Sequence, residues 1–187
     1  MMHSHYDIFQ SCRAGNAKGQ RILYDLFKGK LMGLCRRYTS SREEAQDVLQ
    51  DSFIRIFKNF DQLNEPDKLE SWMKSIAVRT AINYYHKGKG RGLMYVDIDT
   101  VSNEIPIYQT SIDYLTDEYL ISLVNALPDG CRIIFNLFAI EGYSHSEIAT
   151  MLQISEGTSR SQLYYAKQLL KGKLNCQNIL HYYEKFS

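Results

Sequence analysis

The chain has 187 residues, of which 44% are hydrophobic and 23% charged, with a formal net charge of +1. These values are typical of a soluble globular protein of one average or two small domains. No apolar run approaches the roughly 20 residues of a membrane-spanning helix, and no secretory signal pattern opens the chain, so we expect no membrane insertion. The four scattered cysteines lack a C-x-x-C pair, which argues against a zinc site and a disulfide framework and predicts reduced thiols in the cytoplasm.

Nearly every periodic segment has the helical period, and no convincing alternating strand is present, which predicts an all-α fold. The expected helices lie at 5–13, 17–38, 42–59, 67–87, 114–127, 130–141, 145–152 and 156–172. A glycine-rich and then acidic stretch around Pro106 separates two groups of helices and is typical of a flexible linker. We therefore predict a helical domain over 1–90, a linker over 91–113 and a second helical domain over 114–187.

The near-neutral net charge conceals a sorting of charges along the chain. Segments 71–96 and 157–183 contain no acidic residue, whereas segment 92–131 contains no lysine or arginine. One basic patch alone would be compatible with an ordinary solvated helix face. Two basic patches on two helical units favour a polyanionic partner such as nucleic acid.

The helix expected at 42–59 has two different faces. Ser41 and Glu44 have capping-box spacing at its start, and its apolar residues form one broad stripe for the core. The opposite face combines Ile54 with Asp47, Asp51 and Lys58, a set that suits docking to a charged protein surface. A single exposed isoleucine is equally compatible with an ordinary surface.

The helix expected at 67–87 is apolar over most of its circumference, with Tyr84 on the packed side. A separate stripe consists of Trp72, Ser75, Arg79, Asn83 and His86. Flat side chains that stack on bases, followed by cations that contact phosphates, are typical of a site for single-stranded nucleic acid. The alternative is that Trp72 belongs to the core.

Two helix-start signals lie within a dozen residues near the C-terminal end. Ser144 and Glu147 form a second capping box, and Ser155 can cap the following helix. On that helix Arg160, Tyr164 and Lys167 share a stripe, with Ser159, Ser161 and Gln162 near its N-terminal half. This pattern predicts a helix-turn-helix with a DNA-reading second helix, although a basic surface helix remains the alternative. We expect His145 to face solvent.

The order of these segments resembles a known family. The segments DVLQDSFIRIF, SWMKSIAVRTAINYYHK and ALPDGCRIIFNLFAIEGYSHSEIATMLQISEGTSRSQLYYAKQLL are similar to regions 2 and 4 of RNA polymerase sigma factors of the extracytoplasmic-function (ECF) group of the sigma-70 family. The resemblance covers roughly 17–87 and 114–174. A helix-turn-helix alone is common, so the order of the three segments makes the resemblance specific.

The resemblance implies a subunit that binds core RNA polymerase, recognises minus-35 and minus-10 promoter elements and initiates transcription at specific genes. The expected minus-35 contacts, combining the resemblance with the helix pattern, are Ser159, Arg160, Ser161, Tyr164, Lys167 and Lys171. The expected minus-10 and melting contacts are Asn64, Trp72, Ser75, Arg79, Asn83, Tyr84 and Lys87. The expected polymerase contacts are Asp47, Gln50, Asp51, Ile54 and Phe57.

The resemblance also implies that the loop 60–70 captures a base flipped from the minus-10 element, that the acidic linker threads the polymerase, and that an anti-sigma factor is a further partner. Arg79 stands where some relatives carry asparagine, which leaves the preferred minus-10 base open.

Two other functions remain as alternatives. The first is a helix-turn-helix transcriptional regulator whose N-terminal half is a sensor or dimerisation domain. The second is an enzyme, which the sequence disfavours because it contains no paired carboxylates, nucleophile–base set, phosphate loop or metal cluster. We therefore expect no catalytic residue, no cofactor, no metal and no small-molecule substrate.

Overall fold

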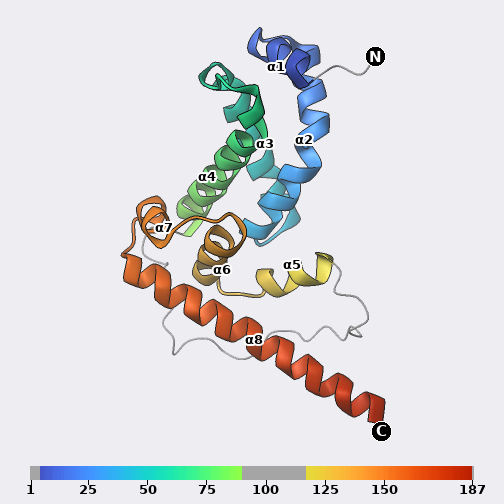
Figure 1. Cartoon of the computed structure of the whole chain (residues 1–187), viewed down its shortest axis with the longest axis vertical. Coiled ribbons are helices and arrows are strands. Elements are labelled where there is room, and N and C mark those ends of the chain that lie inside the picture. The colour runs from blue at the N-terminus through green and yellow to red at the C-terminus, as the bar shows by residue number, and fades with distance from the viewer. Residues whose placement is uncertain (1–4, 90–116, 187) are drawn as a thin grey trace. The chain divides into compact units, whose positions relative to one another are not determined.

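The computed structural model describes residues 5–89 and 117–186, with side chains at 6–87 and 121–173. All regular elements in these ranges are helical and none is a strand, which confirms the predicted all-α class (Figure 1). The chain folds as two compact units, Met1–Gly88 and Lys89–Ser187. The linker predicted at 91–113 lies outside the described residues. Among those residues, no helix is both long and apolar enough to cross a membrane.

In the described residues 5–89, the first unit contains four α-helices and two short 3₁₀ turns. They are α1 (His5–Arg13), α2 (Ala17–Tyr38), α3 (Arg42–Lys58), η1 (Phe60–Gln62), η2 (Pro66–Lys68) and α4 (Leu69–Lys89). The first three helices begin at the predicted residues. Asn16 and Ser41 cap α2 and α3 by accepting hydrogen bonds from the backbone N–H groups of Lys18 and Glu44. Pro66 opens η2, so α4 starts two residues later than expected.

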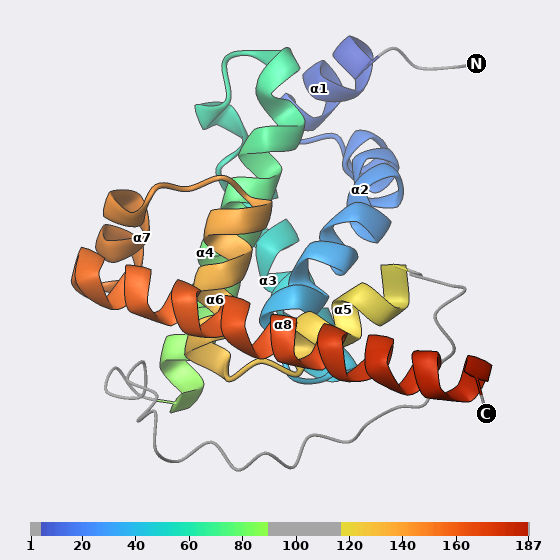
Figure 2. The same ribbon diagram turned by 60° about the horizontal axis from the view of Figure 1, so that its bottom comes forward.

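The core of the first unit follows the helical period. On α2, buried residues recur at three- and four-residue steps at Leu23, Phe27, Leu31 and Leu34. The inward faces of α3 and α4 add Val48, Ile56, Met73, Ala77 and Ile82. Figures 1 and 2 show α3 and α4 side by side in this unit. The packing leaves Asp47, Asp51 and Ile54 of α3 and Arg79 and Asn83 of α4 exposed.

The second unit contains α5 (Asp117–Asn125), α6 (Asp129–Phe135), a π-helical turn η4 (Asn136–Ile140), α7 (His145–Leu152) and α8 (Glu156–Phe186). Its centre includes Leu127, Cys131 and Ala166, with Phe135 and Tyr165 packed around them. We expected α8 to end at 172, and this was wrong. A single glycine at Gly172 costs a helix only about 1 kcal/mol and does not end it, and no proline follows.

Candidate functional site

The helix-turn-helix in the second unit is held by the caps that the sequence predicts. The Ser144 hydroxyl accepts from the Glu147 N–H at 3.3 Å, and the Glu147 carboxylate accepts from the Ser144 N–H at 2.8 Å. Gln153 adopts a left-handed conformation, with φ of 57°, which ends α7. Ser155 then caps α8 by accepting from the Thr158 N–H at 3.0 Å. These contacts fix the turn between the two helices.

The capping box also lowers the pKa of Glu147, chiefly through the hydrogen bond from the Ser144 backbone and then through the Ser144 hydroxyl. A carboxylate with a lowered pKa in the folded state stabilises that state above its unfolded pKa. The contribution disappears as the pH falls through the folded pKa. The start of α7 therefore depends on an ionised Glu147 at neutral pH.

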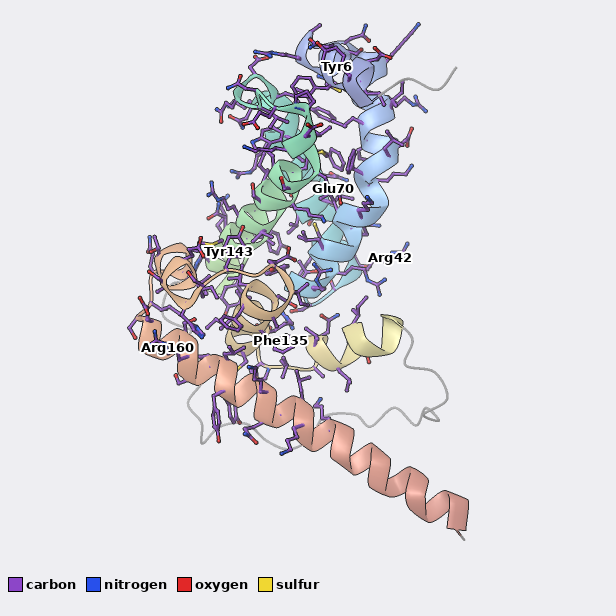
Figure 3. The ribbon with its side chains drawn as sticks, viewed as in Figure 1. Tyr6, Arg42, Glu70, Phe135, Tyr143 and Arg160 are labelled. Atoms are coloured by element: carbon purple, nitrogen blue, oxygen red, sulfur yellow. The ribbon has the colours of Figure 1, made fainter. Side chains whose placement is uncertain are left out.

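An exposed stripe runs along α8. It consists of Arg160, Ser161, Tyr164, Lys167 and Lys171. Tyr164 is 66% exposed, which is unusual for so large an aromatic side chain. The Arg160 guanidinium donates to the Glu156 carboxylate at 2.7 Å, and both side chains remain largely in solvent. Figure 3 labels Arg160 on the first turns of α8. The stripe therefore presents donors, a flat ring and cations together.

Ser159 does not belong to this stripe, so its expected minus-35 contact is corrected. Its side chain is fully buried and its hydroxyl is 2.8 Å from His145 Nδ1. The reason is helical geometry, since Ser159 lies three and four residues before the buried pair Gln162 and Leu163. Gln162, which we also expected near the DNA, instead accepts from Cys131 Sγ at 2.8 Å.

His145 does not face solvent as we expected, because it is half-buried between two elements. Its ring stacks on Phe138 of η4 with centroids 4.6 Å apart, and it contacts Ser159 of α8. Lys167 lies 5.8 Å from the centre of the same Phe138 ring. The pairing was invisible in the sequence, because a histidine at a helix start gives no signal of a partner fourteen residues away.

The contacts of His145 with Phe138 and Ser159 predict that this side chain holds α8 in the orientation that DNA binding requires. Replacing His145 with alanine removes the stacked ring and leaves the Ser159 hydroxyl buried, which should cost about 1–2 kcal/mol of stability and weaken binding to minus-35 DNA. Urea unfolding of the variant and a titration of promoter DNA with the variant bound to core RNA polymerase measure the two effects. His145→Asn, which can still hydrogen-bond Ser159, should recover part of both. Binding that stays unchanged in His145→Ala would show that these contacts do not orient α8.

In the first unit, the polar stripe of α4 is present on the surface, and its aromatic residue is half-buried. Trp72 contacts the edge of Phe60, with centroids 5.9 Å apart and planes at 87°. Ser75 donates to the Trp72 carbonyl at 2.8 Å. Arg79, Asn83 and Lys87 are exposed, as is Asn64 in the loop before η2. Trp72 is thus neither a core residue nor free in solvent.

Tyr84 was placed on the packed side of α4, and this was wrong. The buried neighbour is Tyr85, whereas Tyr84 is half-exposed. Desolvation and then the negative charges of Glu44 and Asp47 raise the pKa of Tyr84, which indicates that its hydroxyl lies near the start of α3. The position is compatible with a minus-10 contact and brings α4 close to the acidic side of α3.

The outer face of α3 carries the five expected polymerase contacts. Asp47, Gln50 and Asp51 are exposed, and Ile54 is 63% exposed. Phe57 is half-buried against Phe53, with ring centroids 5.8 Å apart. The face therefore combines acidic groups with an unprotected apolar side chain, which is typical of a protein-binding surface.

Sequence reasoning missed a contribution from α2 to this region. Tyr24 packs on Phe53 with ring centroids 4.7 Å apart, and Lys28 lies 5.6 Å from the Tyr24 ring centre. Tyr24 is 37% exposed. A tyrosine one residue beyond the buried stripe of α2 was the available signal, but its neighbour on α3 could not be inferred from spacing alone.

Acidic, histidine and cysteine side chains in the described part of the chain bear on metal binding and thiol chemistry. No group of three or more histidine, cysteine, aspartate or glutamate side chains there could hold a metal ion. Burial raises the pKa of the Cys131 thiol to about 11, which keeps it protonated at neutral pH.

The two units together define a class of protein, a helical module with an exposed polar and basic stripe on α4 followed by a helix-turn-helix. Comparison with protein families identifies it. Sigma-70 region 2 matches residues 23–91 and Sigma-70, region 4 matches residues 117–170, together more than half of the chain. The chain belongs to the sigma-70 family of RNA polymerase sigma factors, in its ECF group.

Individual relatives are distant but align over most of their length. The chain is 26% identical over 178 residues to the ECF RNA polymerase sigma-E factor of Haemophilus influenzae, covering 89% of this chain and 93% of the relative. It is 26% identical over 170 residues to the RNA polymerase sigma-H factor of Pseudomonas aeruginosa, covering 82% and 86%. The fold resembles the sigma factor RpoE of Bartonella quintana, solved with the anti-sigma factor NepR, with a TM-score of 0.52, 20% identity and coverage of 83% and 96%.

Proposed function

We propose that this chain is a promoter-specificity subunit that joins core RNA polymerase and contacts the promoter at two places. One observation carries the proposal: a single chain contains both a region 2 unit and a region 4 unit. The region 2 unit exposes the acidic and apolar face of α3, and the region 4 unit exposes the basic stripe of α8. A regulator with a sensor or dimerisation domain would not need the region 2 unit. In this proposal the protein is not an enzyme, and it acts in the cytoplasm together with DNA and polymerase.

The α8 stripe would recognise the minus-35 element in duplex DNA. Arg160, Ser161 and Tyr164 are exposed near the capped start of α8, where a recognition helix contacts base edges. Lys167 and Lys171 follow on the same side and would contact phosphates. Arg160 pairs with Glu156 in the free chain, and an exposed ion pair of this kind costs little to break. The guanidinium is therefore available to a base.

The α4 stripe and the loop before it would bind the melted minus-10 element. Trp72 offers a half-exposed ring for stacking, and Arg79, Asn83 and Lys87 continue along the helix toward its basic end. Asn64 is exposed in the loop that we propose captures a flipped base. A base held in a protein pocket offsets an unstacking cost of a few kcal/mol, so opening would need no nucleotide hydrolysis.

The α3 face would dock on core polymerase through Asp47, Gln50, Asp51, Ile54 and Phe57, with Tyr24 at its margin. Its acidic groups suit a basic partner surface and its exposed isoleucine suits an apolar contact. An anti-sigma factor is proposed as a further partner, supported by the family and by the partner of the Bartonella quintana protein. A protein that covers α3 or α8 would compete directly with polymerase or DNA.

Binding to purified core RNA polymerase tests this proposal against the regulator alternative. The purified chain should form a stable complex with core polymerase and should bind duplex promoter DNA tightly only within that complex. A helix-turn-helix regulator would instead bind a palindromic duplex site by itself and would ignore core polymerase. That second outcome would refute the proposal.

Substitution of Arg160 tests the minus-35 contact. Arg160→Ala should weaken holoenzyme binding to its promoter by roughly 1–3 kcal/mol, because a base contact is lost. Footprinting should show reduced minus-35 protection with minus-10 contacts retained. The matched control is Glu156→Ala, which removes only the intrahelical partner of Arg160 and should not weaken binding. Unchanged minus-35 protection in Arg160→Ala would exclude Arg160 from recognition.

A further inference from the structure

The helix α1 lies before the segment that matches region 2, which begins at residue 23. It packs on α2 and also contacts η1 and η2, the two turns of the loop that precedes α4. Its inward face consists of Ile8, Phe9 and Cys12, all buried, and Phe9 is only 1% exposed. So α1 is fitted against the loop and is not a loose N-terminal extension.

A line of aromatic contacts connects α1 to the proposed DNA-binding stripe. The Phe9 ring centre lies 5.5 Å from that of Phe60 in η1, with planes at 47°. Phe60, 2% exposed, in turn lies 5.9 Å from Trp72 in edge-to-face geometry. Both separations are within the range of favourable aromatic pairs. Phe60 is therefore fixed from one side by Phe9 and contacts Trp72 on the other.

The position of α1 on α2 leaves almost no freedom. A Cβ atom on Gly19 of α2 would collide with the Ser11 side chain of α1, at 2.6 Å from Ser11 Cβ and closer still to Ser11 Oγ, so only glycine permits this approach. The connecting turn uses Gly15 at a φ of 69°, a left-handed conformation that suits glycine. Close packing and a fixed turn together hold Phe9 against Phe60.

We propose that, during promoter opening, α1 supports the loop that precedes α4. Phe9 acts as a positioning residue, because it sets the orientation of Trp72 through Phe60. This inference rests on the proposed function and extends it to a helix outside the matched region. Phe9 itself touches no DNA. Phe9 keeps the Trp72 ring, on which a base would stack, in its binding orientation before DNA arrives. This lowers the entropy cost of ordering that side chain when the DNA opens.

The chain provides its own probe, because Trp72 is its single tryptophan. Intrinsic fluorescence therefore reports the surroundings of this one ring in the full-length protein. Phe9→Ala should shift the Trp72 emission to longer wavelength, because Phe60 loses its support and water reaches the indole. The matched control is Ile8→Ala, which also removes buried volume from α1 but from a side chain outside the aromatic line. It should leave the emission unchanged.

Promoter opening by the holoenzyme gives the functional readout. Phe9→Ala should slow open-complex formation on a duplex promoter by roughly tenfold, as misplaced positioning groups do. It should bind core polymerase normally and act like the wild type on a template already unpaired at minus-10. Ile8→Ala should open the duplex at the wild-type rate. Opening by Phe9→Ala that is no slower than by Ile8→Ala, or an unchanged Trp72 emission, would overturn the inference.

A second pair of variants covers the case in which Phe9→Ala fails to fold. Phe9→Leu keeps an apolar side chain and should still slow promoter opening. The double variant Phe9→Leu/Phe60→Leu should open the promoter no more slowly than Phe60→Leu alone. Additive effects would show that Phe9 does not act through Phe60, and would overturn the inference. A wild-type chain that opens no promoter at all would contradict the proposed function itself.

Discussion

Asp51→Arg is expected to weaken binding to core RNA polymerase by more than about a hundredfold, or roughly 3 kcal/mol. Asp51 is exposed in the middle of the α3 face, between Asp47 and Ile54. If that face docks on a basic surface, an arginine places like charges together in a contact that excludes water. The fold should be unaffected, because the side chain makes no buried contact.

The measurement is an equilibrium titration of labelled core polymerase with each variant. The matched control, Glu65→Arg, makes the same change of charge in the loop before η2, where Glu65 forms only an exposed ion pair with Lys68. Its polymerase affinity should stay near the wild-type value. Wild-type affinity in Asp51→Arg would remove the α3 face from the polymerase interface, even if the chain is a working sigma factor.

Asp129→Ala is expected to destabilise the second unit by about 3 kcal/mol, the typical cost of leaving one member of a buried ion pair without its partner. The Arg132 side chain is 4% exposed and donates to Asp129 at 2.7 Å. It also donates to the Asn125 carbonyl at 3.2 Å. Without Asp129 the guanidinium keeps its charge inside the unit, and the Asn125 carbonyl still accepts a hydrogen bond from it.

Urea unfolding followed by helical circular dichroism measures this loss. Trp72 fluorescence provides an internal reference, because that residue belongs to the first unit, and its transition should be unchanged. Glu156→Ala is the control, since it breaks a solvent-exposed pair that is worth less than about 1 kcal/mol. Equal losses in the two variants would show that the Asp129–Arg132 pair contributes nothing beyond a surface ion pair.

Helix positions could be predicted from sequence because their signals are local. Ser41 and Ser144 lie three residues before a glutamate, and each serine caps its helix. The capping box is complete at Ser144 and Glu147, whereas the Glu44 carboxylate accepts from the N–H of Ser40 instead of that of Ser41. The period of about 3.6 residues identified the exposed faces of α3 and α8. Such information depends on neighbours within one or two turns, and these neighbours are visible in the sequence.

Contacts between elements could not be predicted in the same way. Ser159 was expected at the DNA because it is polar and stands beside Arg160, yet it lies on the buried face of α8 with Gln162 and Leu163. Its hydrogen-bond partner, His145, comes from another helix and could not be inferred from spacing. Tyr84 and Tyr85 are adjacent and chemically identical, so only packing shows which one is buried. The link from Phe9 to Trp72 joins residues that are far apart in the chain and depends on the tertiary fold.

Transcription in vitro tests the central claim most directly. Purified core RNA polymerase is mixed with the full-length chain and with fragmented DNA from the source genome, and the transcripts are sequenced. Our account predicts transcripts that start at discrete sites and share upstream minus-35 and minus-10 elements, and that disappear when the chain is omitted. Folded protein that binds DNA yet yields no start site above the level of core polymerase alone would contradict it.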